Sequence, residues 1–199
     1  MFKDNKDIFQ ILSDAVSEGI VIVDANRNIV STNISADVMF GYNKHELIGK
    51  GLNILIPQNH HSKHDIYFEV FYKNSEKRKM GHGRDLFGLH KNGHQFPVEV
   101  GLNPFTIFDN TYVMALIIDI TERKQAEQER NYLSKIFDDS LNEIYVFDLV
   151  SLKFINANYG AQKNLGYSLG ELKEMTLMDI KPGFIEKKIR KLTEPLVKK

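Results

Sequence analysis

The residues with the clearest chemical potential are three histidines within one short segment, His60, His61 and His64. His60 and His64 are one helical turn apart, so on a helix their imidazoles would share a face and could chelate a metal ion. No carboxylate triad or further spaced ligand joins them, as a dedicated metal centre would need. The alternative is that His64 is a partly buried helix histidine with a hydrogen-bond partner.

A second segment with chemical potential is Gly81-His82-Gly83-Arg84. It is too short for a dinucleotide-binding loop, which would also need a helix behind it rather than the strand expected here. If no ligand binds there, Arg84 would pair with an acidic side chain across a sheet or stay solvated. No nucleophile–base pair or paired carboxylate stands out elsewhere, and kinase and cyclase motifs are missing. We therefore expect no catalytic residues, and a chain that is not an enzyme by itself.

The composition of the 199 residues is that of a globular protein, with 42% hydrophobic and 26% charged residues. Lys+Arg and Asp+Glu both number 26, so no basic excess indicates a nucleic-acid partner. Cysteine is absent, which excludes disulfides, thiolate metal sites and cysteine nucleophiles. The N-terminus does not read as a signal peptide, and no apolar run approaches the ~20 residues that span a bilayer. These features predict a soluble, cytoplasmic protein with no membrane partner.

The chemically interesting residues must be positioned by helices and strands that the hydrophobic spacing predicts. Apolar residues at helical spacing, or helix-favouring composition, predict helices at residues 8–17, 34–40, 44–48, 58–73 and 121–131. Alternating or continuous apolar runs predict strands at residues 19–24, 29–33, 84–89, 95–105 and 111–120. The last three strands follow one another, and Asn92-Gly93 is a hairpin turn between the first two of them.

The second half of the chain repeats the first. Residues 142–148 align with residues 18–24, and one extra residue follows in the next turn. The alignment then pairs Asn33 with Asn158, Ala36 with Ala161, Gly41-Tyr42 with Gly166-Tyr167, Glu46-Leu47 with Glu171-Leu172, and Pro57 with Pro182. A spacing of about 125 residues marks a tandem domain repeat rather than a short solenoid period. The first copy continues through three more strands, and we expect the second to stop before them.

Four segments together resemble the PAS family. They are the opening strand Gly19-Ile20-Val21-Ile22-Val23-Asp24, the helical stretch from Asn33 through Phe40-Gly41-Tyr42 to Lys50, the hairpin Lys91-Asn92-Gly93-His94-Gln95-Phe96-Pro97, and the closing Asp119-Ile120-Thr121-Glu122-Arg123. The resemblance implies an α+β fold, with a five-stranded antiparallel sheet and helices on one face. It also implies a PAS domain at residues 8–121, a helical linker at 122–137, and the N-terminal half of a second PAS domain at 138–199.

Part of the first domain resembles the oxygen-sensing PAS kinases of the FixL type. The similarity runs without a gap from His64 to Leu102, and it includes the segment His64-Asp65-x-Tyr67 and the Gly-x-Gly-Arg segment that ends at Arg84. It implies a heme b cofactor, with His64 as the iron ligand and Tyr67 beside it. It further implies that Arg84 hydrogen-bonds oxygen or a propionate, and that Val100 and Leu102 are apolar residues over the distal face. A neutral imidazole does bind heme iron, and a cation does stabilise polarised oxygen.

The chain departs from the FixL-type pattern at two positions. Val70 stands where an arginine anchors a propionate, and Arg78 stands where a histidine does so. Arg78 can still pair with a carboxylate, so we include it among the expected cofactor-binding residues. Flavin photochemistry that depends on a cysteine thiol is excluded because the chain has no cysteine. A PAS domain that binds no cofactor stays open beside heme.

The PAS resemblance implies a sensory module of a two-component system. Such a module binds a small ligand or mediates dimerisation, and relays through the helix after residue 121 to an output domain or kinase. Sparse apolar positions in that helix, among them Leu133 and Ile136, predict a short helix pair in a homodimer rather than a full heptad seam. Two alternatives remain: a cofactor-free module for protein–protein interaction, and the sensor fragment of a histidine kinase.

Overall fold

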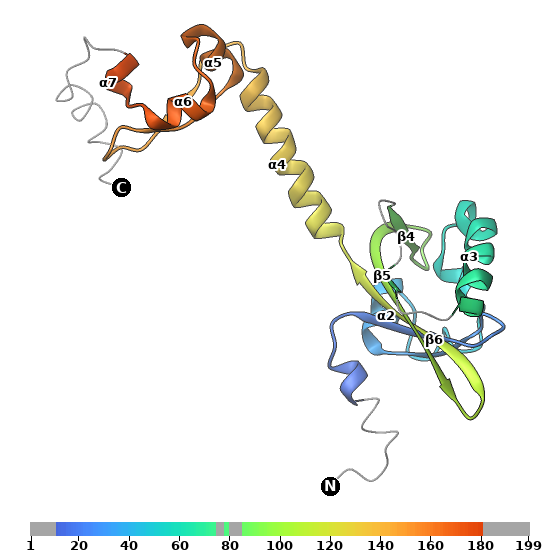
Figure 1. Ribbon diagram of the computed structural model, residues 1–199. Helices are drawn as coiled ribbons and strands as arrows, with labels where there is room; N and C mark the ends of the chain where they lie inside the picture. Colours follow the sequence, from blue (N-terminus) through green and yellow to red (C-terminus); the bar gives the residue numbers. More distant parts are fainter. Residues whose placement is uncertain (1–10, 75–77, 80–84, 181–199) are drawn as a thin grey trace. The chain divides into compact units, whose positions relative to one another are not determined.

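The computed structural model describes residues 11–74, 78–79 and 85–180. The chain divides into two units, Met1–Gln125 and Ala126–Lys199, here called the first unit and the second unit. The first unit contains a broad antiparallel sheet, and the second contains a two-stranded sheet with short helices (Figure 1). The candidate site residues all belong to the first unit.

The sheet of the first unit has the strand order β2-β1-β6-β5, and two short strands share the last position beside β5. The strands are β1 (Gly19–Val23), β2 (Ile29–Thr32), β3 (Arg78–Lys79), β4 (Leu86–Leu89), β5 (Gln95–Ile107) and β6 (Asn110–Asp119). Strand β4 pairs with the start of β5 and β3 pairs further along it. All pairs are antiparallel, so the predicted five-position sheet is confirmed, with its edge divided between β3 and β4.

The helices of the first unit cover one face of this sheet. They are α2 (Ile34–Phe40), η1 (Leu52–Leu55), η2 (Gln58–His60) and α3 (His61–Asn74). Helix α2 begins at Asn33, whose side chain accepts a hydrogen bond from the Ala36 amide, and it ends at Gly41 with φ of 75°. A left-handed residue that closes a helix is most often glycine, because glycine has no Cβ to clash.

The helix predicted over residues 44–48 is wrong. The segment is instead a series of turns, in which the amides of Glu46, Ile48 and Lys50 bond to carbonyls three residues earlier. His45 has a φ of 64°, outside the helical region, and Gly49 is also left-handed. Two left-handed residues in six positions prevent a continuous helix, although the composition favours one.

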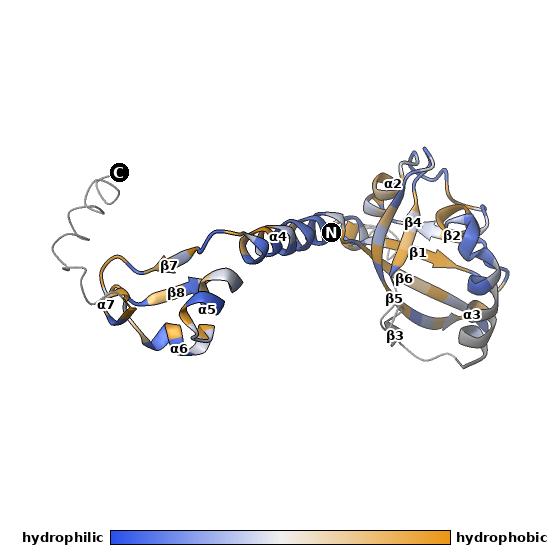
Figure 2. Cartoon of the chain, turned by 90° about the horizontal axis from the view of Figure 1, so that it is seen from above, coloured by the Kyte–Doolittle hydropathy of each residue, from blue (hydrophilic) through white to orange (hydrophobic). Residues whose placement is uncertain are grey.

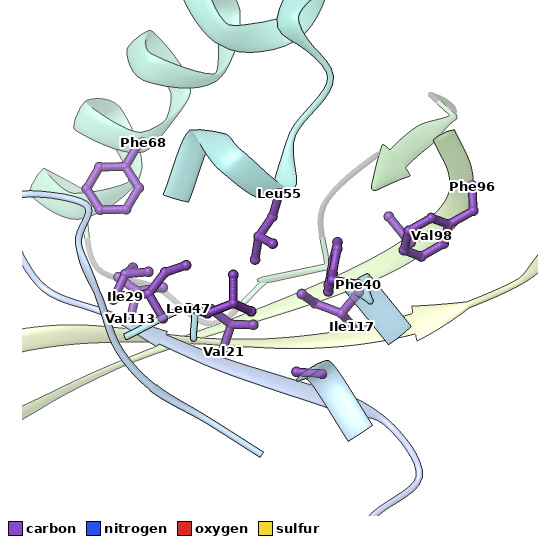
Figure 3. Packing of buried hydrophobic residues seen from close by; sticks show 12 residues of the cluster. Val21, Ile29, Phe40, Leu47, Leu55, Phe68, Phe96, Val98, Val113 and Ile117 are labelled. Carbon is purple, nitrogen blue, oxygen red and sulfur yellow. The ribbon is translucent and has the colours of Figure 1, made fainter. Parts of the chain in front are cut away.

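A cluster of twelve buried apolar residues joins the helices to the sheet (Figure 3). Phe40 from α2, Leu55 from η1 and Phe68 from α3 meet side chains from alternate positions of the strands, such as Phe96 and Val98 on β5. The rings of Phe40 and Phe96 lie 5.3 Å apart between centroids. Because all these helices contribute to one cluster, they pack on the same face of the sheet, here called the inner face.

Helix α4 (Thr121–Asp139) follows β6 and extends beyond the predicted 121–131. It begins where Asp119 Oδ1 accepts a hydrogen bond from the Thr121 amide at 2.8 Å. None of its side chains is buried, and it is mostly hydrophilic (Figure 2). Over the described ranges, no helix of the chain is long and apolar enough to cross a membrane.

The second unit repeats the start of the first. It contains the hairpin β7 (Tyr145–Phe147) and β8 (Phe154–Ala157), then α5 (Tyr159–Leu165), α6 (Leu169–Glu174) and α7 (Leu177–Ile180). The register of the hairpin shifts between Val146 and Phe147, as it does between Ile22 and Val23 in the first unit. Over the described residues, its core cluster has four buried members, Phe154, Ala157, Ala161 and Leu172.

Candidate ligand site on the inner face

Helix α3 presents His64 toward the core. Phe68 is only 8% exposed and belongs to the core cluster. His64 lies one helical turn earlier, so the two side chains share a face of α3. Its side chain is partly buried, and the Nδ1 atom is shielded from solvent. An imidazole on this face is the arrangement that a ligand held between α3 and the sheet would require.

The sheet opposite α3 is apolar where the sequence placed the distal residues. Val100 and Leu102 are partly buried and pack against the core cluster. They continue the inward alternation of Phe96 and Val98 on β5, since every second residue of a strand points to the same face. Both predicted distal residues therefore line the inner face, as the sequence pattern required.

The far end of α3 is tied to the sheet by Tyr72. Its hydroxyl donates a hydrogen bond to the Thr111 carbonyl at 3.1 Å, and its ring stacks on Phe68 with 5.9 Å between centroids. His64, Phe68 and Tyr72 thus form a row at successive turns along one face of α3. The sequence analysis did not single out Tyr72, although the spacing of four residues from Phe68 was a usable signal.

The other predicted site residues are placed less directly. Tyr67 is 40% exposed, one position from the inward Phe68, and its role at a ligand stays a prediction. Arg78 is in β3, where its Cα is opposite that of Leu102. Arg84 lies outside the described residues, so its predicted role is not tested.

The three histidines do not assemble a metal centre. His61 Nε2 is 2.8 Å from the Ile56 carbonyl oxygen, which engages one of the ring's two nitrogens. In the part of the chain that the structure describes, no group of three or more His, Cys, Asp or Glu side chains could hold a metal ion.

The turn between β4 and β5 is fixed by charge near the end of α2. Lys91 Nζ bonds to Glu46 at 2.6 Å, and the Lys91 amide donates to the Phe40 carbonyl at 2.9 Å. The hydrogen bond from Lys91 is the largest influence that lowers the pKa of Glu46 to about 2. Lys91 and Lys50 both lie over the ring of Tyr42, whose pKa is raised mainly by burial. This cluster positions the start of β5, the strand that carries the candidate site.

The donor set of the inner face is compatible with heme. Heme iron binds an imidazole and the ring needs apolar surroundings. His64 on α3 offers the imidazole, and Phe68, Val100 and Leu102 offer apolar side chains. The described residues supply no carboxylate triad or thiolate that would favour another metal. The residues present therefore fit the group in kind.

The antiparallel sheet and the helices packed on its inner face define an α+β domain. The sequence model of the PAS fold matches residues 7–120, and the chain belongs to the PAS family. The family predicted from the motifs is thereby confirmed.

Two curated relatives are sensor proteins. FixL of Bradyrhizobium diazoefficiens, a sensor protein, is 26% identical over 112 residues, which are 56% of this chain. DosP of Escherichia coli, an oxygen sensor protein, is 24% identical over 176 residues, which are 86% of this chain. The chain spans 22% of the length of each relative.

A solved structure supports the fold. The crystal structure of the PAS domain of a protein from Colwellia psychrerythraea superimposes with a TM-score of 0.52 at 23% identity, and the match covers 60% of this chain and 100% of that one. At this identity the likeness shows the fold alone.

Proposed function

We propose that the chain is a sensory PAS module whose first unit binds heme through His64 and senses a gas. The observation that carries the proposal is the place of His64 on the core-facing side of α3, with Nδ1 buried, over an apolar inner face. The similarity to FixL and to the oxygen sensor DosP supports the same ligand class. A heme held there would supply an iron atom that binds a diatomic gas.

Each residue of the site has a distinct role in this proposal. The imidazole of His64 would hold the iron, and the bond from Tyr72 to the sheet would keep α3 and that imidazole in place. Val100 and Leu102 would exclude water on the side of the sheet. Arg78 and Arg84 would supply cations for the propionates or for a polarised ligand, and Tyr67 would contact the ligand from α3.

The proposal is tested by absorbance after the purified protein is exposed to hemin. We expect a Soret band that His64→Ala abolishes, whereas the matched variant His60→Ala, at the end of η2 four residues earlier, retains it. A protein that shows no Soret band, or a His64→Ala variant with an unchanged one, would remove heme from this site. Circular dichroism of both variants checks that α3 remains folded.

A second candidate function is protein–protein interaction without a cofactor. Leu116 and Ile118 of β6 are more than a third exposed on the face of the sheet away from the core, and Leu133 and Ile136 of α4 are more than half exposed. Apolar side chains on these surfaces favour a homodimer through α4 and the sheet. Leu133→Glu should shift the protein toward monomer in sedimentation velocity, while Glu129→Lys on the same helix serves as the control. An unchanged mass for Leu133→Glu would reject the α4 dimer.

Under either candidate, α4 is the output of the first unit. Arg123 and Lys124 on its first turns pair with Glu99 of β5 and Asp85. A change at the inner face that moves β5 or β6 therefore also moves the first turns of α4. We propose that α4 has two positions, that the ligand shifts the population between them, and that this shift is passed to an output domain such as a histidine kinase.

A further inference from the structure

One buried side chain in the second unit binds the end of helix α4. Asn158 is fully buried, and its Nδ2 donates hydrogen bonds to the carbonyls of Phe137 at 3.0 Å and Asn142 at 2.9 Å. Its Oδ1 accepts from the amides of Ile144 at 2.9 Å and Ala161 at 3.0 Å. Phe137 belongs to the last turn of α4, Ile144 adjoins β7, and Ala161 is in the first turn of α5. We call these four bonds the amide clamp.

The first unit contains the same clamp at Asn33. This side chain is 1% exposed and donates to the carbonyls of Ser13 at 2.8 Å and Glu18 at 2.9 Å. It accepts from the amides of Ile20 at 2.8 Å and Ala36 at 2.9 Å. The repeat alignment pairs each partner with its counterpart: Ser13 with Phe137, Glu18 with Asn142, Ile20 with Ile144, and Ala36 with Ala161.

A carboxamide suits this position because it offers two donors and an acceptor with two lone pairs. The clamp uses all of them, so it connects a preceding helix end, a strand and a following helix through one rigid group. Helix α4 has no buried side chain, so apolar packing contributes little to holding its end on the second unit. Buried hydrogen bonds are costly to break without replacement, and the clamp is therefore the main attachment of the α4 terminus.

We infer that Asn158 is the positioning residue through which α4 moves the second unit. A shift of the last turn of α4 displaces the Phe137 carbonyl, and the clamp passes that displacement to β7 and α5 together. The inference rests on the proposed role of α4 as a relay, and it does not depend on which ligand the first unit binds. By the same geometry, Asn33 receives a helical segment that ends near Ser13, so the first unit has an input of the same kind.

Two substitutions at Asn158 separate the clamp from the helix cap. Asn158→Ser keeps an N-cap oxygen for Ala161 without reaching the Phe137 carbonyl. Asn158→Asp keeps both acceptor bonds but removes both donors. In hydrogen exchange on the full chain without ligand, we expect both variants to speed exchange of the last two turns of α4 by about tenfold, while the Ala161 amide keeps its protection.

Two controls keep this result specific. Leu172→Ala weakens the second unit's core without touching the clamp, because Leu172 is buried among apolar residues. Asn33→Ser should loosen the helical residues 11–14 and leave the end of α4 unchanged. The inference fails if Leu172→Ala, at equal loss of stability, loosens the α4 terminus as much as Asn158→Ser does, or if neither Asn158 variant loosens it.

A double-mutant cycle tests transmission itself. Glu129→Gly weakens α4 at an exposed position. In the wild-type background it should raise exchange at Ile144 and Ala161 about threefold or more, and in the Asn158→Ser background this response should vanish. An equal response in both backgrounds would overturn the relay through Asn158. Because no cofactor enters either experiment, a negative Soret test and a negative exchange test remain separate results.

Discussion

In the first unit, strand β1 is hydrogen-bonded on both edges, to β2 and to β6. Its counterpart β7 in the second unit pairs with β8 alone over the residues described. The clusters beneath these strands differ accordingly, with twelve buried apolar residues in one and four in the other. Five of the twelve, Phe68, Phe96, Val98, Val113 and Ile117, come from α3 and the last strands. The comparison shows which contacts the first hairpin and the short helices make by themselves, and which contacts require α3 and the strands β4 to β6.

Both units contain the same helix caps, helix-closing glycines and bonds from a backbone amide to a glutamate. Asn33 and Asn158 cap the first helix, and Gly41 and Gly166 close it with φ of 75° and 76°. Asn43 and Ser168 both donate their amide to a glutamate three residues on. These bonds span few residues, so they form without the rest of the sheet. Residues 44–49, however, form turns in the first unit, whereas the aligned residues 169–174 form helix α6 in the second. The units therefore differ in burial and in this one segment.

The largest contrast is expected from truncating Phe40. This ring packs against Phe96 of β5, so Phe40→Ala should lower the free energy of unfolding of the first unit by about 3–5 kcal/mol. The second unit should be unaffected, because its core shares no residue with the cluster around Phe40. Urea titration followed by residue-resolved hydrogen exchange measures the two units separately. Leu172→Ala is the reciprocal control, and equal losses in both units from either variant would contradict two independent cores.

Hydrogen exchange of the unmodified chain should rank the two hairpins. Amides of β1 lie in a sheet that is paired on both sides, whereas those of β7 can open without breaking a second ladder. We expect residues 145–147 to exchange at least about a hundredfold faster than residues 19–23, since protection follows the opening free energy of each unit. The aligned segments 18–24 and 142–148 provide the matched comparison. Equal protection would mean that a partner or another segment completes the second sheet.

The sequence predicted those parts of the fold that short-range patterns encode. Alternation in β5 identified Val100 and Leu102 as inward-facing, whereas His64 was singled out by the resemblance to FixL-type domains and not by helical spacing. The helix expected at residues 44–48 failed because a left-handed His45 has no compositional signature. Tyr72 was missed because its partner, the Thr111 carbonyl, is a backbone group 39 positions away. Long-range bonds to backbone atoms leave no trace in residue types, so Asn33 and Asn158 were visible only as a pair of aligned asparagines in the repeat.

The two helix-closing glycines, Gly41 and Gly166, test how much the β4–β5 hairpin restricts the end of the preceding helix. A Cβ at Gly166 would have no neighbour within 4 Å, so Gly166→Ala should cost about 1–2 kcal/mol from the left-handed backbone alone. A Cβ at Gly41 would lie 2.1 Å from His90 Nε2, in the turn between β4 and β5. Gly41→Ala should therefore cost more, since His90 must also move. Thermal denaturation of both variants, with Gly41→Ala in a His90→Ala background as the control, separates backbone strain from the clash. Equal losses for the two single variants would refute a contribution from His90.

The smallest effect is expected at Glu46 and Glu171, which the repeat aligns and which differ in that Glu46 has a lysine partner. Glu46 has a pKa of about 2, below its ordinary 4.5, chiefly because Lys91 donates hydrogen bonds to it. The pKa of Glu171 is also lowered, chiefly by the Ser168 amide, and in the described part of the chain it forms no ion pair. A carboxyl with a lowered folded-state pKa stabilises the protein fully above pH ~4.5 and loses that contribution as the pH falls toward the folded value. Glu46→Gln should thus reduce the fall in the first unit's free energy of unfolding between about pH 4.5 and 2, and Glu171→Gln should reduce that of the second unit less.

Added salt should weaken the effect at Glu46 more than that at Glu171, because the ion pair of Glu46 is solvent-exposed. If both variants gave the same pH and salt dependence, the side chain of Lys91 would contribute nothing to stability. The β4–β5 turn would then be held to α2 only by the hydrogen bond from the Lys91 amide to the Phe40 carbonyl.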